Sequence, residues 1–270
     1  MGQGRDTRLK LRAVSELGRH PSLILYALKH PSLNQLRERA RYLDGVDGDR
    51  LVSDIKLRST RKKDSRFVFE GAEYEYLYHD YNKTWACERA VEVPIIWRIV
   101  RAHQSKQILE VGNVLSHYFD TQHVIVDKYE KGPGVLNEDI LDYSPTTRFD
   151  LVVSISTVEH IGWSTMHGPR DPPLAIRALD KMSSLLRPSG ELWFTIPMGY
   201  NSFLDGMVKS RNLGLSRMYF MKRISGDNVW IQCNLEDAVG QQYGGFKLRW
   251  TDSPPFPKAN AILVGMIQSK

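Results

Sequence analysis

The chain has 270 residues, of which 41% are hydrophobic and 10% aromatic, and its formal net charge is +6 at pH 7. This composition fits a packed globular domain, and no apolar run approaches the roughly 20 residues that cross a bilayer. The opening residues MGQGRDTRLKLR lack the apolar segment of a secretory signal, so we expect a cytoplasmic protein.

The first 65 residues differ in charge from the rest. Residues 1–63 hold 15 Lys or Arg against 7 Asp or Glu, a net charge of +8, whereas the remaining 22 and 24 give −2. The apolar LILYALK and the mixed-charge NQLRERARYL predict helices. We therefore expect a basic helical extension over 1–65 that contacts a protein partner or the inner face of a membrane. A solvated helical face is the alternative.

A second segment, 66–105, leads into the following domain, which we expect to span 66–270. Apolar residues recur at helical spacing in TWACERAVEVPIIWRIV and predict a helix over 84–100. Pro94 falls inside this helix, where it removes a backbone donor, so we expect a kink or a break there. We interpret 66–105 as a lid and helix segment that lies over a ligand site.

From residue 106 the pattern changes to short apolar segments. One amphipathic helix, 173–187, separates them clearly, and RPSG at 187–190 ends it. Strand, helix and strand in succession predict a parallel α/β sheet, while the Gly-Asp turn near residue 226 and the final strand predict an antiparallel C-terminal edge. The predicted strands are 107–112, 123–127, 134–139, 149–156, 191–197, 228–234 and 260–268.

Acidic and polar residues follow the first four predicted strands. A parallel sheet binds ligands beyond the carboxyl ends of its strands, so these residues should surround one site. Asp127 at the end of the second strand is well placed to accept hydrogen bonds from two ribose hydroxyls. The residues at the strand ends are Glu110, Gly112, Asp127, Glu138, Asp139 and Ser156.

The segments ILEVG, VIVD, NEDI, FDLVVSISTVEHIG and LRPSGELWFTIP, in this order, resemble class I S-adenosylmethionine-dependent methyltransferases. The resemblance covers about 106–200 and implies a Rossmann-like methyltransferase sheet, methyl transfer, and S-adenosylmethionine as cofactor. Two crossover helices should be reduced. Few residues separate Gly112 from the second strand, and Gly132-Pro133-Gly134 disfavours a helix before the third.

The resemblance also implies roles for single residues. Glu110 would lie near the amino-acid end of the cofactor, Asp127 would bind the ribose, and Ser156 would face the sulfonium. Val114 and Ser116 replace two loop glycines, but S-adenosylmethionine has no phosphate that needs them, unlike nicotinamide or flavin dinucleotides. A cofactor site that no longer binds is the alternative. The predicted cofactor set is Glu110, Gly112, Asn113, Asp127, Asp139, Ile140 and Ser156.

His160 follows the fourth strand, where the resemblance places the acceptor, and an imidazole can take a proton from a hydroxyl at neutral pH. We predict His160 as the catalytic base and Glu159 as the residue that orients it. The alternative is that both are structural. His79, His117 and His167 are weaker candidates. Glu159 and His160 have no third metal ligand nearby in sequence, so we predict no metal.

Tyr81, Asn82 and Arg89 precede the sheet in a segment rich in aromatic and amide side chains, which suit sugars. With Trp163 and Tyr200 they form the predicted substrate set. Together with SISTVEHIGW, this segment resembles bacterial methyltransferases of glycan and surface-polysaccharide assembly. That implies O-methylation of a sugar hydroxyl on a glycan or glycolipid precursor.

Two other functions stay open. One is methylation of another small molecule, and the other is a non-catalytic module that recruits a partner or a membrane. Nucleic acid is disfavoured because the fourth strand ends in SIST, without the Pro-Pro-aromatic box of amino-directed DNA methyltransferases, and the sequence has no Pro-Cys pair.

Overall fold

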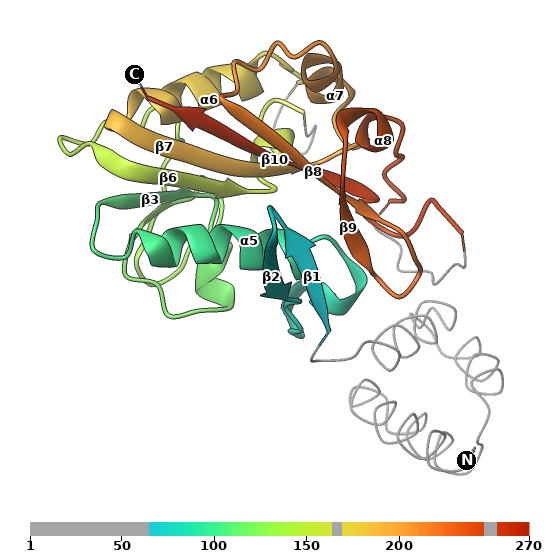
Figure 1. Ribbon diagram of the computed structural model, residues 1–270. Helices are drawn as coiled ribbons and strands as arrows, with labels where there is room; N and C mark the ends of the chain where they lie inside the picture. The colour runs from blue at the N-terminus through green and yellow to red at the C-terminus, as the bar shows by residue number, and fades with distance from the viewer. Residues whose placement is uncertain (1–64, 164–168, 246–252, 270) are drawn as a thin grey trace, which may run out of the picture.

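The computed structural model describes residues 65–163, 169–245 and 253–269. Within them an eight-stranded sheet has the order β5-β4-β3-β6-β7-β10-β8-β9, and Figure 1 shows its twist. The strands are β3 (Ile108–Val111), β4 (Val124–Val126), β5 (Val135–Leu136), β6 (Phe149–Ile155), β7 (Leu186–Pro197), β8 (Arg217–Arg223), β9 (Trp230–Cys233) and β10 (Ala261–Gln268).

The first five strands of the sheet run parallel, and the other pairings are antiparallel. This is the mostly parallel, Rossmann-like sheet with an antiparallel side that the sequence predicts. The C-terminal strand β10 lies between β7 and β8, so the outermost antiparallel strand is β9 rather than the last strand of the chain.

Helices and a hairpin cover the two faces of the sheet (Figure 1). On one face lie α6 (Leu174–Ser184), α7 (Ser202–Lys209) and α8 (Leu235–Val239). On the other lie α5 (Arg89–Ala102) and the hairpin of β1 (Arg66–Phe69) and β2 (Ala72–Glu75). Because both faces are covered, β6 is apolar on both sides: Val152 packs toward the first core, and Leu151 and Val153 toward the second.

The helix predicted over 84–100 begins later than expected. A 3₁₀ turn, η1 (Tyr81–Ala86), comes first, and α5 then runs unbroken through Pro94, so the predicted break is wrong. The reason is a substitute hydrogen bond. Pro94 cannot donate to the Ala90 carbonyl, and the backbone N–H of Leu77 donates to that carbonyl instead, at 3.0 Å.

The reduced crossover helices are confirmed in the described residues. Between β3 and β4 there is only the short η2 (Leu115–His117), and between β4 and β5 there is no helix. The β1–β2 hairpin was not predicted, nor were α7 and α8. The two-residue turn of this hairpin, Glu70-Gly71, has φ of 48° and 71°, as a tight hairpin turn requires.

The predicted extension 1–65 and His167 lie outside the described residues, apart from Ser65. Among the residues that the structure describes, no helix is long and apolar enough to cross a membrane.

Candidate functional site

A cavity of about 510 Å³ opens at the carboxyl ends of β3, β4, β5 and β6. Val111, Val126, Ile140, Ile161 and Leu174 give it apolar walls. Of the fourteen residues in the predicted catalytic, cofactor and substrate sets, the cavity brings together ten: Tyr81, Asn82, Arg89, Gly112, Asn113, Asp127, Asp139, Ile140, Ser156 and His160. Four others, Glu110, Glu159, Trp163 and Tyr200, are not in its lining.

Gly112 follows β3 directly and lies against Thr157, which comes just after β6. Its φ is +86°, and a Cβ placed on it would lie 2.2 Å from Oγ1 and 2.8 Å from Cγ2 of Thr157. No side chain fits there unless the Thr157 side chain or the backbone that carries it moves. The chain therefore needs glycine at this position for its own packing, and the absent side chain also keeps the cavity floor open.

Asp127 is held rigidly by the turn that follows β4. Its Oδ1 accepts hydrogen bonds from the backbone N–H groups of Tyr129 (2.8 Å) and Glu130 (2.7 Å), and its Oδ2 accepts from the N–H of Asn113 (2.9 Å). A carboxylate oxygen has two lone pairs, so Oδ2 keeps one for a ligand. Asp127 is therefore an oriented acceptor on the cavity wall.

Asp139 and Ile140 line the cavity beyond β5. Partial burial disfavours the charged carboxylate, but hydrogen bonds from Lys128 Nζ (2.8 Å) and the N–H of Leu141 (3.0 Å) lower the pKa of Asp139 below its usual value. Asp139 is therefore ionised at neutral pH. Ile140 is buried and gives this part of the cavity an apolar surface.

Glu110 does not reach the cavity. It is fully buried under the loop after β3, where Oε1 accepts from the N–H groups of Val114 (2.9 Å) and Leu115 (2.8 Å) and Oε2 lies 2.7 Å from His123 Nε2. Both oxygens already have protein partners. The expectation that Glu110 lies near the cofactor thus needs correction, because its side chain shapes the loop from behind.

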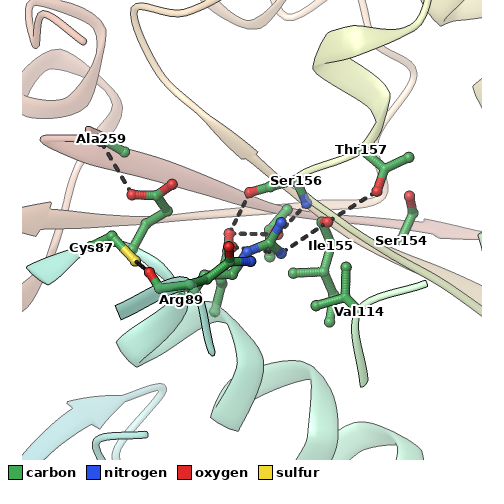
Figure 2. A network of polar contacts seen from close by, with 12 residues as sticks. Cys87, Arg89, Val114, Ser154, Ile155, Ser156, Thr157 and Ala259 are labelled. Atoms are coloured by element: carbon green, nitrogen blue, oxygen red, sulfur yellow. Dashed lines mark hydrogen bonds and ion pairs between the residues drawn. The ribbon is translucent and has the colours of Figure 1, made fainter. Parts of the chain in front are cut away.

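A buried network ties α5 to the ends of β6 and β7 (Figure 2). Arg89 Nη1 donates to the Ile155 carbonyl (3.1 Å) and pairs with Glu92 Oε1 at 3.1 Å. Glu92 Oε2 accepts from the hydroxyls of Ser156 (2.7 Å) and Thr195 (2.9 Å). Burial raises the pKa of Glu92, and Arg89 opposes this shift. The network fixes Arg89 in the cavity wall and Ser156 at its floor.

Sequence reasoning missed Glu92 and Thr195. A signal for Glu92 did exist, since it is a carboxylate inside the apolar run AVEVPII, at a helix position that is wholly buried. A charge at such a position needs partners. Ser156 has φ of +40°, an uncommon conformation for a residue with a side chain, and its backbone N–H donates to the Thr195 carbonyl (3.0 Å).

His160 lies at the cavity rim between Glu159 and Tyr200. Its Nδ1 is 3.0 Å from the Tyr200 hydroxyl, and its Nε2 is 3.6 Å from Glu159 Oε1. Although 47% of the side chain is exposed, desolvation and the nearby Arg89 lower the pKa of His160 from its usual 6.5. The ring is therefore neutral at neutral pH, and it can accept the Tyr200 hydrogen bond at Nδ1 with the proton on Nε2.

Glu159 lies behind His160 and out of contact with the cavity. Only 1% of the residue is exposed, and complete burial raises its pKa well above the usual carboxyl value. Its Oε2 has no hydrogen-bond partner among the described residues. The raised pKa of Glu159 favours its protonated form, which cannot take a proton, whereas the lowered pKa of His160 favours the neutral ring that can act as a base.

The remaining predicted substrate residues divide into two groups. Tyr81 and Asn82 lie at the cavity mouth, where the Tyr81 ring stacks on His117 with 4.0 Å between ring centroids. His117 in turn lies 2.7 Å from Glu130 Oε1. Trp163 is outside the cavity lining, and the Arg170 guanidinium lies 4.4 Å from the centre of its ring.

Comparisons with known proteins give only distant matches. No protein-family model matches the chain, and no curated protein matches it. Among solved structures it is similar to the N-methyltransferase NodS from Bradyrhizobium japonicum WM9 in complex with S-adenosyl-L-homocysteine. The two are 14% identical with a TM-score of 0.40, over 66% of this chain and 87% of that one.

Two further structures are similar at this level. A putative methyltransferase from Bacillus halodurans C-125 is 11% identical with a TM-score of 0.38, over 66% of this chain and 98% of that one. The 1,6-didemethyltoxoflavin-N1-methyltransferase from Burkholderia thailandensis is 14% identical with a TM-score of 0.36, over 76% and 98%. Such similarity assigns no activity, so the fold is taken from the strand order and the chemistry from the cavity.

Proposed function

We propose that the chain is an S-adenosylmethionine-dependent methyltransferase. The observation that carries this proposal is that one cavity combines three features. Asp127 is an oriented carboxylate on its wall, Ile140 gives an apolar surface, and Gly112 leaves the floor without a side chain. A ribose offers two hydroxyl donors, an adenine offers a flat ring, and a sulfonium nucleoside needs no phosphate cradle. The cavity volume lies within the usual range for small ligands.

The residues present fit this cofactor. Asp127 would accept a hydrogen bond from one ribose hydroxyl with the free lone pair of Oδ2, and Ile140 with the Asp139 carboxylate would hold the adenine. Gly112 leaves room for close approach of the ligand to the backbone. Ser156, at the end of β6, would lie near the reacting group. When bound, S-adenosylmethionine supplies an electrophilic methyl group on a sulfonium.

We assign proton removal from the acceptor to His160. A base needs an unprotonated ring nitrogen. Because Nε2 lies toward Glu159 and carries the proton, the unprotonated nitrogen is Nδ1, which the Tyr200 hydroxyl contacts. An acceptor hydroxyl would share or replace this contact. The lowered pKa of His160 keeps the ring in the neutral form that can accept a proton. Glu159 and Tyr200 then act as positioning residues.

A sugar hydroxyl is the acceptor that these residues suit best. Tyr81 offers a partly exposed ring at the cavity mouth, and Asn82 and Arg89 add hydrogen-bonding groups beside it. Ring faces bind the apolar faces of sugars, and amides and guanidinium groups bind their hydroxyls. In this proposal the basic residues 1–65 recruit the protein to a partner or to the inner membrane face where such glycans or glycolipids are assembled.

Isothermal titration with S-adenosylmethionine and S-adenosylhomocysteine tests the proposal. The wild-type chain should bind both, and Asp127→Ala should weaken both by about tenfold or more. Transfer of a labelled methyl group to saccharides, measured by mass spectrometry, then identifies the acceptor. Failure of the wild-type chain to bind either compound favours the second function, a non-catalytic binding module.

A further inference from the structure

Asp127 has room for only one hydroxyl of a ribose, which carries two on adjacent carbons. Its Oδ1 accepts from the backbone N–H groups of Tyr129 and Glu130, and its Oδ2 accepts from the N–H of Asn113. A carboxylate oxygen has two lone pairs, so a single one remains, on Oδ2. A second hydroxyl that left water without finding an acceptor would weaken binding. The cavity should therefore hold another acceptor close to Asp127.

Glu130 is such an acceptor, and it belongs to the same turn. It follows Asp127 by three residues and lines the cavity, and 38% of its side chain is exposed. Asn113 contacts both carboxylates. Its backbone N–H donates to Asp127 Oδ2 and its side-chain Nδ2 donates to Glu130 Oε1, each over 2.9 Å. One residue that bonds both carboxylates keeps them side by side on the cavity wall.

Only one oxygen of Glu130 is used by the protein. Oε1 accepts from Asn113 Nδ2 and lies 2.7 Å from Nε2 of His117. Within the described part of the chain, no hydrogen bond or ion pair reaches Oε2. The two contacts at Oε1 fix the orientation of the carboxylate, while Oε2 keeps its lone pairs for a ligand. Glu130 is thus an oriented carboxylate with acceptor capacity left over, as Asp127 is.

His117 is itself held by the segment before the sheet. Its ring stacks on that of Tyr81, with 4.0 Å between centroids and 18° between planes. Tyr81 also lies near both carboxylates, since partial burial, Glu130 and Asp127 raise the pKa of its hydroxyl while Arg89 opposes this rise. The stack covers one face of the His117 ring and leaves the Nε2 edge on Glu130. Tyr81 and His117 thereby hold Glu130 in place.

The other carboxylates of the cavity lining are less suited to a ribose at Asp127. Asp139 pairs with Lys128 Nζ (2.8 Å) beyond β5, where we assign it to the adenine. Glu138 is exposed, and within the described residues its side chain makes no bond to Asp127. Glu130 is the lining carboxylate that shares both a turn and a bonded neighbour with Asp127.

We infer that Glu130 accepts a hydrogen bond from the second ribose hydroxyl of the cofactor, next to the hydroxyl that Asp127 binds. This inference rests on the proposed function, because it adds a residue to the site of the proposed cofactor. The bond goes to Oε2 of Glu130, while His117 and Tyr81 act as positioning residues through Oε1. The ribose is then held by two carboxylates of one turn, each of which binds one hydroxyl.

Calorimetric titration of the full chain with S-adenosylhomocysteine and with its 2′-deoxy and 3′-deoxy analogues tests this assignment. Glu130→Gln keeps the shape of the side chain, and its oxygen satisfies Asn113 and His117, so an amide NH₂ replaces the acceptor Oε2. Glu236→Gln is the matched control, since Glu236 is an exposed carboxylate on α8, outside the cavity. Circular dichroism checks that the variants are folded, and Glu130→Ala takes the place of Glu130→Gln if the latter is not.

We expect Glu130→Gln to bind S-adenosylhomocysteine about tenfold less tightly than wild type, and Glu236→Gln to bind it unchanged. The analogue that lacks the hydroxyl bound by Glu130 should bind wild type about tenfold less tightly and lose no further affinity in Glu130→Gln. The other analogue should still lose about tenfold in this variant. Wild-type affinity in Glu130→Gln, or an equal loss for all three ligands, overturns the inference.

The positioning role of His117 is tested in the same way. His117→Ala removes the donor at Oε1 of Glu130 and should weaken S-adenosylhomocysteine binding by about threefold. His117→Gln carries an amide that donates from nearly the same place as Nε2, so it should restore most of the lost affinity. The same loss in both variants would remove His117 as a positioning residue.

These titrations also separate the inference from the proposed function. If the wild-type chain binds none of the three ligands, the proposed cofactor site fails, and the inference fails with it. If it binds them in a way that depends on Asp127 but not on Glu130, the cofactor site stands and only the role of Glu130 is withdrawn.

Discussion

Replacement of Gly112 by Ala tests the central geometric feature of the cavity. Gly112 has φ of +86°, and an added Cβ would meet three side-chain atoms of Thr157 at 2.2, 2.8 and 2.9 Å. Contacts below 3.0 Å cannot persist, so the loop after β3 must move, or the Thr157 side chain and the end of β6 that carries it must move. Both segments line the cavity, and the movement should therefore lower ligand affinity as well as stability.

The expected loss of unfolding free energy in Gly112→Ala has two parts. A positive φ costs a residue with a Cβ about 1–2 kcal/mol, and forcing extra volume into a packed site costs about 1–3 kcal/mol more. Gly71→Ala isolates the first part, because Gly71 has φ of +71° and no atom within 4 Å of an added Cβ. Gly71→Ala should thus lose about 1–2 kcal/mol of unfolding free energy and Gly112→Ala about 2–5 kcal/mol.

Urea unfolding of the two variants measures this difference, and titration with S-adenosylhomocysteine measures the effect on the cavity. Gly71→Ala should bind as wild type does, since Gly71 lies in the β1–β2 turn. The double variant Gly112→Ala, Thr157→Ala removes the two shortest contacts and should recover part of the lost stability. Equal unfolding free energies for Gly112→Ala and Gly71→Ala would refute the argument that Thr157 closes this space.

Four further outcomes are expected. Asp127→Ala should weaken S-adenosylhomocysteine binding about tenfold or more in calorimetry, since it removes an oriented carboxylate whose Oδ2 keeps a lone pair for the ligand. In an NMR titration the His160 ring should titrate below 6.5, and Tyr200→Phe should raise its midpoint, because the lost hydroxyl no longer stabilises the neutral ring; an unchanged midpoint contradicts this. Burial raises the pKa of Glu159. Its contribution to the free energy of unfolding is therefore fully present below pH 4.5 and is lost as the pH rises through the raised pKa. When the free energy of unfolding in urea is measured against pH, Glu159→Gln should flatten this decline. A chain that begins at Arg66 should unfold cooperatively and still bind S-adenosylhomocysteine; loss of the cooperative transition in circular dichroism would show that residues 1–65 belong to the core.

Short-range patterns in the sequence predicted seven of the eight strands of the sheet and left out β8. Each predicted strand is a run of apolar residues bounded by turn residues, and every one of the seven is present in the structure. The hairpin of β1 and β2 was missed although Tyr74 and Tyr76 alternate with Glu73 and Glu75 after the Glu70-Gly71 turn. Its signal is only four residues long on each side, too short to separate from a loop by periodicity.

The site was only partly predictable for a physical reason. Residues at strand ends, such as Gly112, Asp127 and Ser156, meet because parallel strands end at one edge, which the sequence pattern implies. Glu92 reaches Ser156 and Thr195 across 64 and 103 residues of chain, and no local pattern encodes those contacts. For the same reason Glu110 was misplaced: its position at a strand end is visible in sequence, but its partner His123 is not.

The segment before the sheet is more than a cover for the site. Arg223, 3% exposed, donates to the Ala86 carbonyl (3.1 Å), and the fully buried Asn228 donates to the carbonyls of Thr84 (3.2 Å) and Cys87 (2.9 Å). These bonds fasten η1 to the β8–β9 hairpin at the far side of the sheet.

Opening this segment would take the Ala86 carbonyl from the buried Arg223 guanidinium and the Thr84 and Cys87 carbonyls from the buried Asn228 amide, which costs more than parting exposed surfaces. Movement over the cavity is thus confined to its exposed tip, where Asn82 and Lys83 have φ of 56° and 50° and Tyr81 is 40% exposed. Because Arg89 follows η1 directly, the same anchoring fixes the guanidinium that lines the cavity. The acceptor side of the site is therefore preorganised by the antiparallel half of the sheet, while its parallel half supplies the residues that we assign to the cofactor.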